Sequence, residues 1–323
     1  MFELIFLGTA ASAPSIQRGL SSAMLLHREY RFLIDCGEGT QRQILRSGLG
    51  FKRLDRILLT HGHLDHILGL GGLVSTFGRW EAIEELEIYG GAWALQRVRE
   101  LMHVVFGTGE TRLHIGYHAI SAGTLLEDNT FRLRAFPVDH RRTEAFGFSF
   151  EEKSRRPFLA EKAESLGVPA GPIRRGLVDG QTITLNDGRV IHPDDVLGPA
   201  IAGARAVFIG DAGRVDNLVS AVAGADLLAI ESTYAEEERE VAAAFGHLTA
   251  RQGAWLAHEA GAKHLVLHHI SRRYSSEQIL AEATPIFPET SVARDFDLFR
   301  VVKQKPVERE DVRQRPVPPP ATL

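Results

Sequence analysis

Residues 57–69 read I-L-L-T-H-G-H-L-D-H-I-L-G, and this stretch decides how the rest of the chain is interpreted. The apolar run Ile57–Leu59 predicts a buried strand that ends at Thr60. Four ligand-type side chains then follow within a few residues: His61, His63, Asp65 and His66. Imidazole and carboxylate are the donors that suit zinc and, less well, manganese or iron. This density favours a metal site over an ordinary polar turn.

The spacing of these four residues predicts how they divide between ions. Alternate residues of an extended segment point the same way, so His61 and His63 can hold one ion together. Asp65 and His66 follow where the chain turns, and they can reach a second ion nearby.

Composition limits the class of protein. The chain has 323 residues, 44% of them hydrophobic and 24% charged, as in an ordinary soluble globular protein. The single cysteine, Cys36, excludes an intrachain disulfide and favours a reducing compartment. The apolar start, residues 1–7, has no basic flank and is too short to cross a bilayer, so it predicts a first strand. A net charge of −4 means that any RNA-binding surface must be a local patch.

The pattern of a strand that ends in a ligand-type residue recurs three more times. His140, Asp211 and His269 each follow a predicted strand, at 130–137, 206–209 and 265–267. His140 alone would more often be an ordinary surface histidine. In a layered α/β protein, however, such strand ends gather along one edge, where ligands bind. The seven donors therefore fit two zinc ions, which suit phosphodiester hydrolysis because a hydroxide between them is a strong nucleophile at neutral pH.

Two segments differ in character from the rest. Residues 151–200 contain proline–glycine clusters and scattered arginines, and they predict an arm with a small hairpin across Asn186–Gly188. An ordinary surface insertion is the alternative, but the basic residues favour contact with nucleic acid. Residues 304–323 are rich in proline and charge, without apolar periodicity, and we expect them to be disordered.

Several motifs together identify a family. Residues 35–43, D-C-G-E-G-T-Q-R-Q, are more specific than the metal motif, and residues 137–141, 167–172, 210–211 and 269–274 follow in the same order. From Phe2 to about Lys303 the chain resembles the metallo-β-lactamase superfamily and, within it, the ribonuclease Z family, endonucleases that trim the 3′ ends of precursor tRNA. This resemblance implies an α/β fold, the αββα sandwich, formed by residues 1–303 with residues 151–200 inserted as a protruding, flexible arm.

The resemblance also implies ligand sets and roles. One zinc would take His61, His63, His140 and Asp211, and the other would take Asp65, His66, His269 and the shared Asp211. Manganese could replace zinc. Asp65 would also orient or deprotonate the attacking water, His247 and Glu231 would protonate the departing 3′ oxygen, and Arg273 would contact phosphate.

The implied reaction is cleavage on the 3′ side of the discriminator nucleotide by a hydroxide between the metals, leaving a tRNA 3′-OH and a 5′-phosphorylated trailer. The arm, with Arg174 and Arg175, would grip the tRNA elbow across a homodimer. The enzyme would be cytoplasmic, with no membrane association.

Four positions depart from the family pattern, and other functions stay open. Leu64 stands where the family usually has glycine, Gly62 where it often has a larger residue, and Ile230 where it commonly has a histidine. His268 could be mistaken for the ligand, but His269 is preferred because it heads the run Ile-Ser-x-Arg-Tyr. The alternatives are a hydrolase of small phosphodiesters or sulfate esters, a metal-free nucleic-acid-binding protein and, least favoured, a lactamase.

Overall fold

The computed structural model describes residues 1–80, 83–107 and 112–315. The chain forms two compact units, one built from residues 1–151 together with the chain from residue 204 onward, the other from residues 152–203. In the described residues no helix is long and apolar enough to cross a membrane.

The first unit contains an eight-stranded sheet in the order β17-β16-β1-β2-β3-β4-β5-β6. Its strands are β1 (Phe2–Gly8), β2 (Ser22–His27), β3 (Tyr30–Ile34), β4 (Arg56–Leu58), β5 (Glu85–Gly90), β6 (His114–Ala119), β16 (Asp297–Val301) and β17 (Glu308–Asp311). Strands β3 to β6 run parallel, and the others pair antiparallel. Because β3 and β4 are parallel neighbours, the residues that follow them, Asp35 and Thr60, come to lie side by side.

The second sheet has seven strands in the order β15-β14-β13-β12-β9-β8-β7. They are β7 (Gly123–Glu127), β8 (Phe131–His140), β9 (Thr143–Glu152), β12 (Arg205–Ile209), β13 (Leu227–Glu231), β14 (Leu265–His268) and β15 (Thr290–Val292). Strands β12 to β15 are parallel. Their carboxyl ends therefore carry Asp211 and His269 to the same edge of the sheet.

The two sheets pack face to face through a core dominated by phenylalanine. Its largest members are Phe2, Phe6, Phe32, Phe131, Phe148, Phe150, Phe208 and Phe299. Burial of each ring contributes about 1.5–3 kcal/mol of hydrophobic free energy. This core between the sheets fixes the position of one sheet edge relative to the other, and with it the positions of the site residues.

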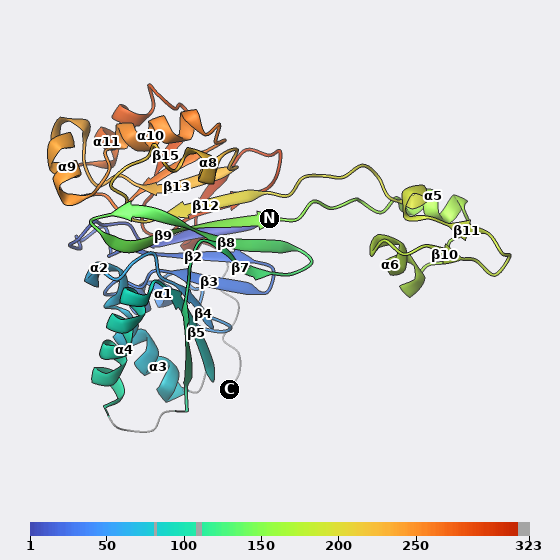
Figure 1. The fold of residues 1–323 in the computed structure, drawn as a ribbon, viewed down its shortest axis with the longest axis horizontal. Helices are drawn as coiled ribbons and strands as arrows, with labels where there is room; N and C mark the ends of the chain where they lie inside the picture. The colour runs from blue at the N-terminus through green and yellow to red at the C-terminus, as the bar shows by residue number, and fades with distance from the viewer. Residues whose placement is uncertain (81–82, 108–111, 316–323) are drawn as a thin grey trace. The chain divides into compact units, whose positions relative to one another are not determined.

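Helices cover the outer face of each sheet (Figure 1). On the first sheet lie α1 (Thr40–Arg46), α2 (Leu64–Ile67), α3 (Leu70–Trp80) and α4 (Ala92–Phe106). Against the second lie α8 (Val219–Val222), α9 (Arg239–Phe245), α10 (Ala250–Glu259) and α11 (Ser276–Ala283), with short 3-10 turns η1 (Glu236–Glu238) and η2 (Val312–Gln314) elsewhere. The predicted αββα sandwich is confirmed.

The second unit contains α5 (Ala160–Ser165), α6 (Pro172–Val178), β10 (Ile183–Thr184), β11 (Val190–Ile191) and α7 (Pro193–Val196). The predicted hairpin is confirmed as the β10–β11 pair. The description of this segment as basic is wrong, because residues 152–203 hold seven Lys or Arg and seven Asp or Glu. Several arginines are also neutralised inside it, since Arg156 pairs with Asp194, and Arg189 pairs with Asp187.

After the histidine cluster the chain forms two helices, α2 and α3, which are separated at Gly69, where a Cβ would lie 2.0 Å from the Gly37 oxygen. One other expectation differs from the structure. The expected disorder from residue 304 is wrong for residues 304–315, because β17 pairs with β16 and η2 buries Val312. The remainder of that expectation, 316–323, lies outside the described residues.

Candidate metal centre

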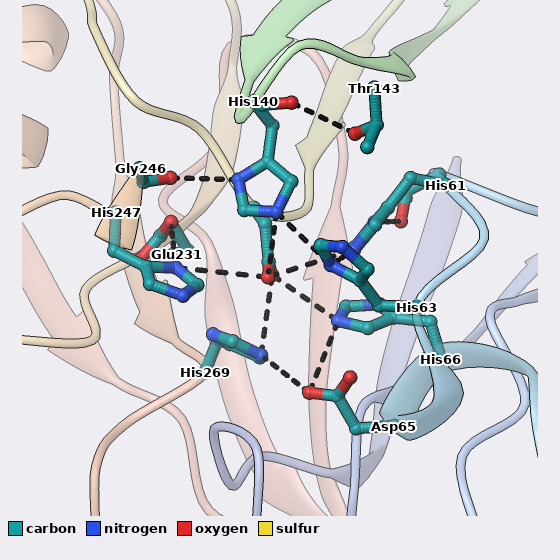
Figure 2. Close-up of polar contacts among 12 residues, drawn as sticks. His61, His63, Asp65, His66, His140, Thr143, Glu231, Gly246, His247 and His269 are labelled. Atoms are coloured by element: carbon teal, nitrogen blue, oxygen red, sulfur yellow. Dashed lines mark hydrogen bonds and ion pairs between the residues drawn. The ribbon is translucent and has the colours of Figure 1, made fainter. Parts of the chain in front are cut away.

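The seven predicted ligands converge in space, and six of them, all but Asp211, are labelled in Figure 2. They come from the loop after β4, the short helix α2 that follows it, the end of β8 and the turns after β12 and β14. Most are fully buried, but Asp65 and His63 keep part of their surface in solvent. The turn at His269 holds a left-handed backbone (φ 57°), and so does Asp35 beside the cluster (φ 56°). Such strained residues persist where the surrounding structure fixes them, as at functional sites.

One group of donors is formed by His61, His63, His140 and Asp211. His63 Nδ1 lies 2.9 Å from His61 Nε2 and 3.2 Å from His140 Nε2. Asp211 Oδ2 lies 3.8 Å from both Nε2 atoms. Ligands at 2.0–2.1 Å around a tetrahedral zinc ion would be separated by about 3.3 Å, so these spacings suit one such ion.

A second group is formed by Asp65, His66 and His269, with the other oxygen of Asp211. Asp65 Oδ2 lies 3.7 Å from His66 Nε2 and 3.6 Å from His269 Nε2. Asp211 Oδ1 lies 3.3 Å and 3.2 Å from the same two nitrogens. Asp211 thus faces one donor group with each carboxylate oxygen, as a bridging ligand would.

The hydrogen bonds behind the histidines fix which ring nitrogen is free. His140 Nδ1 contacts the Gly246 carbonyl at 2.7 Å and must donate to it, because a carbonyl only accepts. The Thr60 hydroxyl donates to Asp35 and therefore accepts from His61 Nδ1 at 3.1 Å. In each case the Nε2 lone pair is left to point into the cluster.

The same arrangement holds in the second group. His66 Nδ1 donates to Asp35 at 2.7 Å. The Thr233 hydroxyl donates to Glu231 and accepts from His269 Nδ1 at 2.9 Å. Hydrogen bonds of this kind orient metal-ligating histidines and raise their basicity.

Unpaired polar atoms test whether these residues fit a metal. His66 Nε2, His269 Nε2 and Asp211 Oδ1 are buried without a hydrogen-bond partner in the described part of the chain. A buried polar group without a partner costs about 1–3 kcal/mol. All three atoms face the space between the ligands of the second group, where a cation would satisfy them together. The residues therefore fit a metal ion.

The charge states of the donors also suit a metal. Burial and the neighbouring His140 lower the pKa of His63 to about 4, and burial and His66 hold the pKa of His61 well below its usual range, so both rings are neutral. Burial raises the pKa of Asp211, but His269 and His66 outweigh it, and the carboxyl stays ionised. His66 is the exception: burial lowers its pKa, yet the carboxylates of Asp211, Asp35 and Asp65 raise it well above the usual value. Metal binding would displace that proton.

His247 and Glu231 form a hydrogen-bonded pair beside the cluster. His247 Nδ1 lies 2.9 Å from Glu231 Oε1 and 3.7 Å from Asp211 Oδ2. Glu231 is fully buried, and it also accepts from the amides of Ala212 and Thr233. Burial lowers the pKa of His247, but the Glu231 carboxylate outweighs this effect and raises it to about 9. Glu231 therefore orients and charges His247 without reaching solvent itself.

The predicted substrate-binding arginines lie in different surroundings. Arg273 Nη1 donates to Glu238 at 2.6 Å. Arg174 donates to the carbonyls of Val168 and Pro169, and only 19% of its side chain is exposed. Arg175 is 86% exposed, with a long contact of 3.7 Å to Asp179. Arg174 thus holds its own loop together, while Arg175 is available to a ligand.

Other residues of the site were not predicted as such. The sequence indicated Asp35 only as part of the motif at residues 35–43, and it did not single out Thr60, Thr233 or Gly246 as functional residues. The available signal was the position of Asp35 and Thr60 at the ends of neighbouring predicted strands. His268 lies in the core, where its Nε2 contacts the Ile209 carbonyl and its ring stacks on Phe208.

The departure at Gly62 has a local cause. A Cβ at this position would lie 2.8 Å from Cε3 of Trp93, whose ring fills the space of a larger side chain. The Arg97 guanidinium stacks on Trp93 and donates to the Gly62 carbonyl at 3.0 Å. Trp93 and Arg97 of α4 therefore fix the loop between His61 and His63.

Comparisons with known proteins agree with this architecture. The profile of the Metallo-beta-lactamase superfamily matches residues 16–247. A ribonuclease Z from Bradyrhizobium diazoefficiens is 46% identical, covering 92% of this chain and 99% of the relative. A ribonuclease Z from Methanothermobacter thermautotrophicus is 37% identical, covering 92% and 95%. The crystal structure of the short form of human tRNase Z has a TM-score of 0.65 and 26% identity, covering 92% and 98%.

The fold of this superfamily and the His/Asp cluster together indicate a metal-binding site. The identity to the curated relatives extends over nearly the whole length of both chains. The chain therefore belongs to the ribonuclease Z family of the metallo-β-lactamase superfamily.

Proposed function

We propose that this protein is an endoribonuclease that cleaves precursor tRNA on the 3′ side of the discriminator nucleotide, leaving a tRNA 3′-OH and a 5′-phosphorylated trailer. The observation that carries the proposal is Asp211, whose two oxygens face two separate groups of donors. Such a paired site suits phosphodiester hydrolysis. The name of the curated relatives supports RNA as the substrate.

The two donor groups would hold two Zn²⁺ ions per subunit, with Mn²⁺ as the alternative. One ion would take His61, His63 and His140, the other would take Asp65, His66 and His269, and both would share Asp211. Bound divalent ions lower the pKa of water and neutralise the charge that develops on a phosphoryl group.

Asp65 would orient and deprotonate the attacking water. It is 16% exposed on its side chain, whereas Asp211 is 3% exposed and Glu231 is fully buried. Its Oδ2 is held by the Ser12 amide at 3.1 Å, which fixes the orientation of the carboxylate. The other oxygen would accept a proton from the attacking water.

His247 would protonate the departing 3′ oxygen. Its Nδ1 is engaged by Glu231, so Nε2 is the nitrogen that can donate to the substrate. Glu231 acts through His247 as a positioning residue, because its own oxygens are occupied by Ala212 and Thr233. A positioned general acid contributes about 10²–10⁴-fold to a rate.

Remote contacts would align the RNA. Arg175 is an exposed arginine of the second unit that would contact the tRNA elbow, while Arg174 holds the surrounding loop through its carbonyls. Arg273 would bind phosphate after leaving Glu238. The proposal includes a cytoplasmic homodimer in which each arm serves the substrate of the partner subunit.

The direct test compares two substrates. The zinc-loaded protein should cut precursor tRNA at one position, mapped by sequencing both products, and should hydrolyse bis(p-nitrophenyl) phosphate. Asp65→Ala should abolish both reactions, whereas Arg175→Gln should raise KM for precursor tRNA only. Hydrolysis of the small ester without cleavage of precursor tRNA would overturn the proposal in favour of a small-ester hydrolase.

A further inference from the structure

A concentration of positive charge in the first unit lines an open pocket of about 820 Å³. Its walls come from residues 14–19, from α1 with the turn before it, and from C-terminal residues that include Arg294 and Arg313. The arginines of this pocket are Arg18, Arg42, Arg46, Arg294 and Arg313. None of them belongs to the metal centre or to the substrate contacts proposed above.

The guanidinium groups differ in how far the protein itself engages them. Arg18 is structural, because it donates to Thr9, Ala293 and Ser276. Arg42 is exposed, and it has no hydrogen-bond, ion-pair or ring partner among residues 1–80, 83–107 and 112–315. Within the described part of the chain, the Arg294 guanidinium has only a contact of 3.7 Å with the exposed Glu277, which water and salt screen strongly. Two cations are thus available to a ligand.

Two more guanidinium groups are brought together on one ring. Arg46 lies 4.9 Å and Arg313 4.5 Å from the centroid of Phe296, a buried residue with a left-handed backbone (φ 76°). Like charges gathered around one ring repel each other unless an anion lies between them. Asp311 pairs with Arg313, and Asp295 accepts from Gly19, Thr9 and Gln43, so neither carboxylate is left for Arg46. The Arg46 guanidinium donates only to the neutral Gln43 side chain among the described residues.

The pocket is connected to the metal centre through its own walls. Ser12 donates its amide to Asp65, and Pro14, the first wall residue, is two residues further on, at most about 7 Å along the chain. On the other wall, Glu38 lies three residues after Asp35, which accepts a hydrogen bond from His66. A polyanion bound at the metal centre can therefore continue into the pocket.

We propose that this pocket binds backbone phosphates of the RNA strand next to the scissile bond. The inference rests on the proposed function and names a contact surface for its substrate. Phosphates are the groups recognised, because Phe296, the one aromatic residue among the described residues that line the pocket, is buried beneath two guanidinium groups. The pocket therefore positions RNA without reading its sequence. The protein has a net negative charge, and its arm holds equal numbers of basic and acidic residues. The pocket would therefore supply a local basic surface for RNA.

The test removes the two least engaged arginines. Arg42→Gln/Arg294→Gln should leave the fold intact, and hydrolysis of bis(p-nitrophenyl) phosphate should match the wild type. For precursor tRNA, KM should rise, and the slope of log affinity against log salt should become shallower by about 0.7 for each phosphate that the variant no longer binds. Arg251→Gln, an exposed arginine on α10 outside the pocket, removes the same kind of charge and should change neither quantity.

Two precursors separate the possible sources of the phosphates. If the trailer occupies the pocket, the KM defect should appear with a long trailer and vanish with a single-nucleotide trailer. If the acceptor stem occupies it, both precursors should show the defect, and mature tRNA should inhibit the variant less. Unchanged KM and salt slope on both precursors would overturn the inference while leaving the proposed function intact. Failure of the wild type to cut either precursor would instead contradict the proposed function.

Discussion

Replacement of Asp35 by Asn tests how the hydrogen bonds behind the ligands support the metal site. Asp35 is fully buried and accepts from the Thr60 amide at 2.8 Å, the Thr60 hydroxyl at 2.7 Å and His66 Nδ1 at 2.7 Å. Asn has one acceptor oxygen, and the Thr60 amide can only donate to it. The amide NH₂ then faces His66 Nδ1, which must become an acceptor and move the ring proton to Nε2.

This change of tautomer places a proton where the ligand lone pair should be. Loss of such a supporting bond typically lowers metal affinity about 10–100-fold, which corresponds to about 1.4–2.7 kcal/mol. Zinc affinity should be measured by competition with a chromophoric chelator, independently of activity. Asp139→Asn is the matched control, because Asp139 is exposed and precedes the ligand His140. Equal zinc affinities for Asp35→Asn and the wild type would refute the reasoning.

Three further predictions concern catalysis, pH and packing. His247→Ala should slow precursor tRNA cleavage by about 10²–10⁴-fold, but slow bis(p-nitrophenyl) phosphate much less, since p-nitrophenolate leaves without a proton; equal losses would make His247 a ligand or a structural residue. Burial raises the pKa of Asp295 from 3.8 to about 6, so the folded state keeps a proton that the unfolded chain releases. The stability that this group contributes is therefore fully present below pH 3.8 and is lost as the pH rises through 6. Urea denaturation of the metal-free proteins should therefore show that the wild type loses up to about 3 kcal/mol of unfolding free energy relative to Asp295→Asn between pH 4 and 7. A difference between the two proteins that stays constant over this pH range would contradict this. Gly69→Ala should destabilise by roughly 1–3 kcal/mol, because its Cβ would meet a main-chain oxygen at 2.0 Å, whereas Gly71→Ala, with its nearest atom at 3.5 Å, should be neutral or stabilising by up to about 1 kcal/mol.

The sequence predicted the strands of the core well because their apolar runs are short and end in recognisable turns. The runs at 4–7, 56–59, 206–209 and 265–267 all correspond to strands. It missed β9, where glycine interrupts the phenylalanine pattern, and β17, whose residues Glu308–Asp311 are all charged. Strand β17 forms through backbone pairing and arginine–carboxylate contacts with β16, which hydrophobic periodicity does not show.

The metal ligands could be predicted from the sequence because most of them follow the end of a strand. Each of the seven donors was found from a strand end or from the resemblance, and the structure brings all of them together. The supporting residues could not be found in this way, because Thr60, Thr233 and the Gly246 carbonyl are ordinary groups until the fold places them behind a histidine. The same is true of the arginine pocket, whose cations are separated by more than two hundred residues in the sequence.

The zinc content of the protein shows whether Asp211 joins the two donor groups into one site for two cations. The metal-free protein should be titrated with Zn²⁺, and zinc per chain should be determined by elemental analysis after excess metal is removed. We expect two zinc ions per chain for the wild type, and a loss of tight binding in both donor groups for Asp211→Ala. A single ion per chain, or two ions that survive the loss of Asp211, would contradict this expectation.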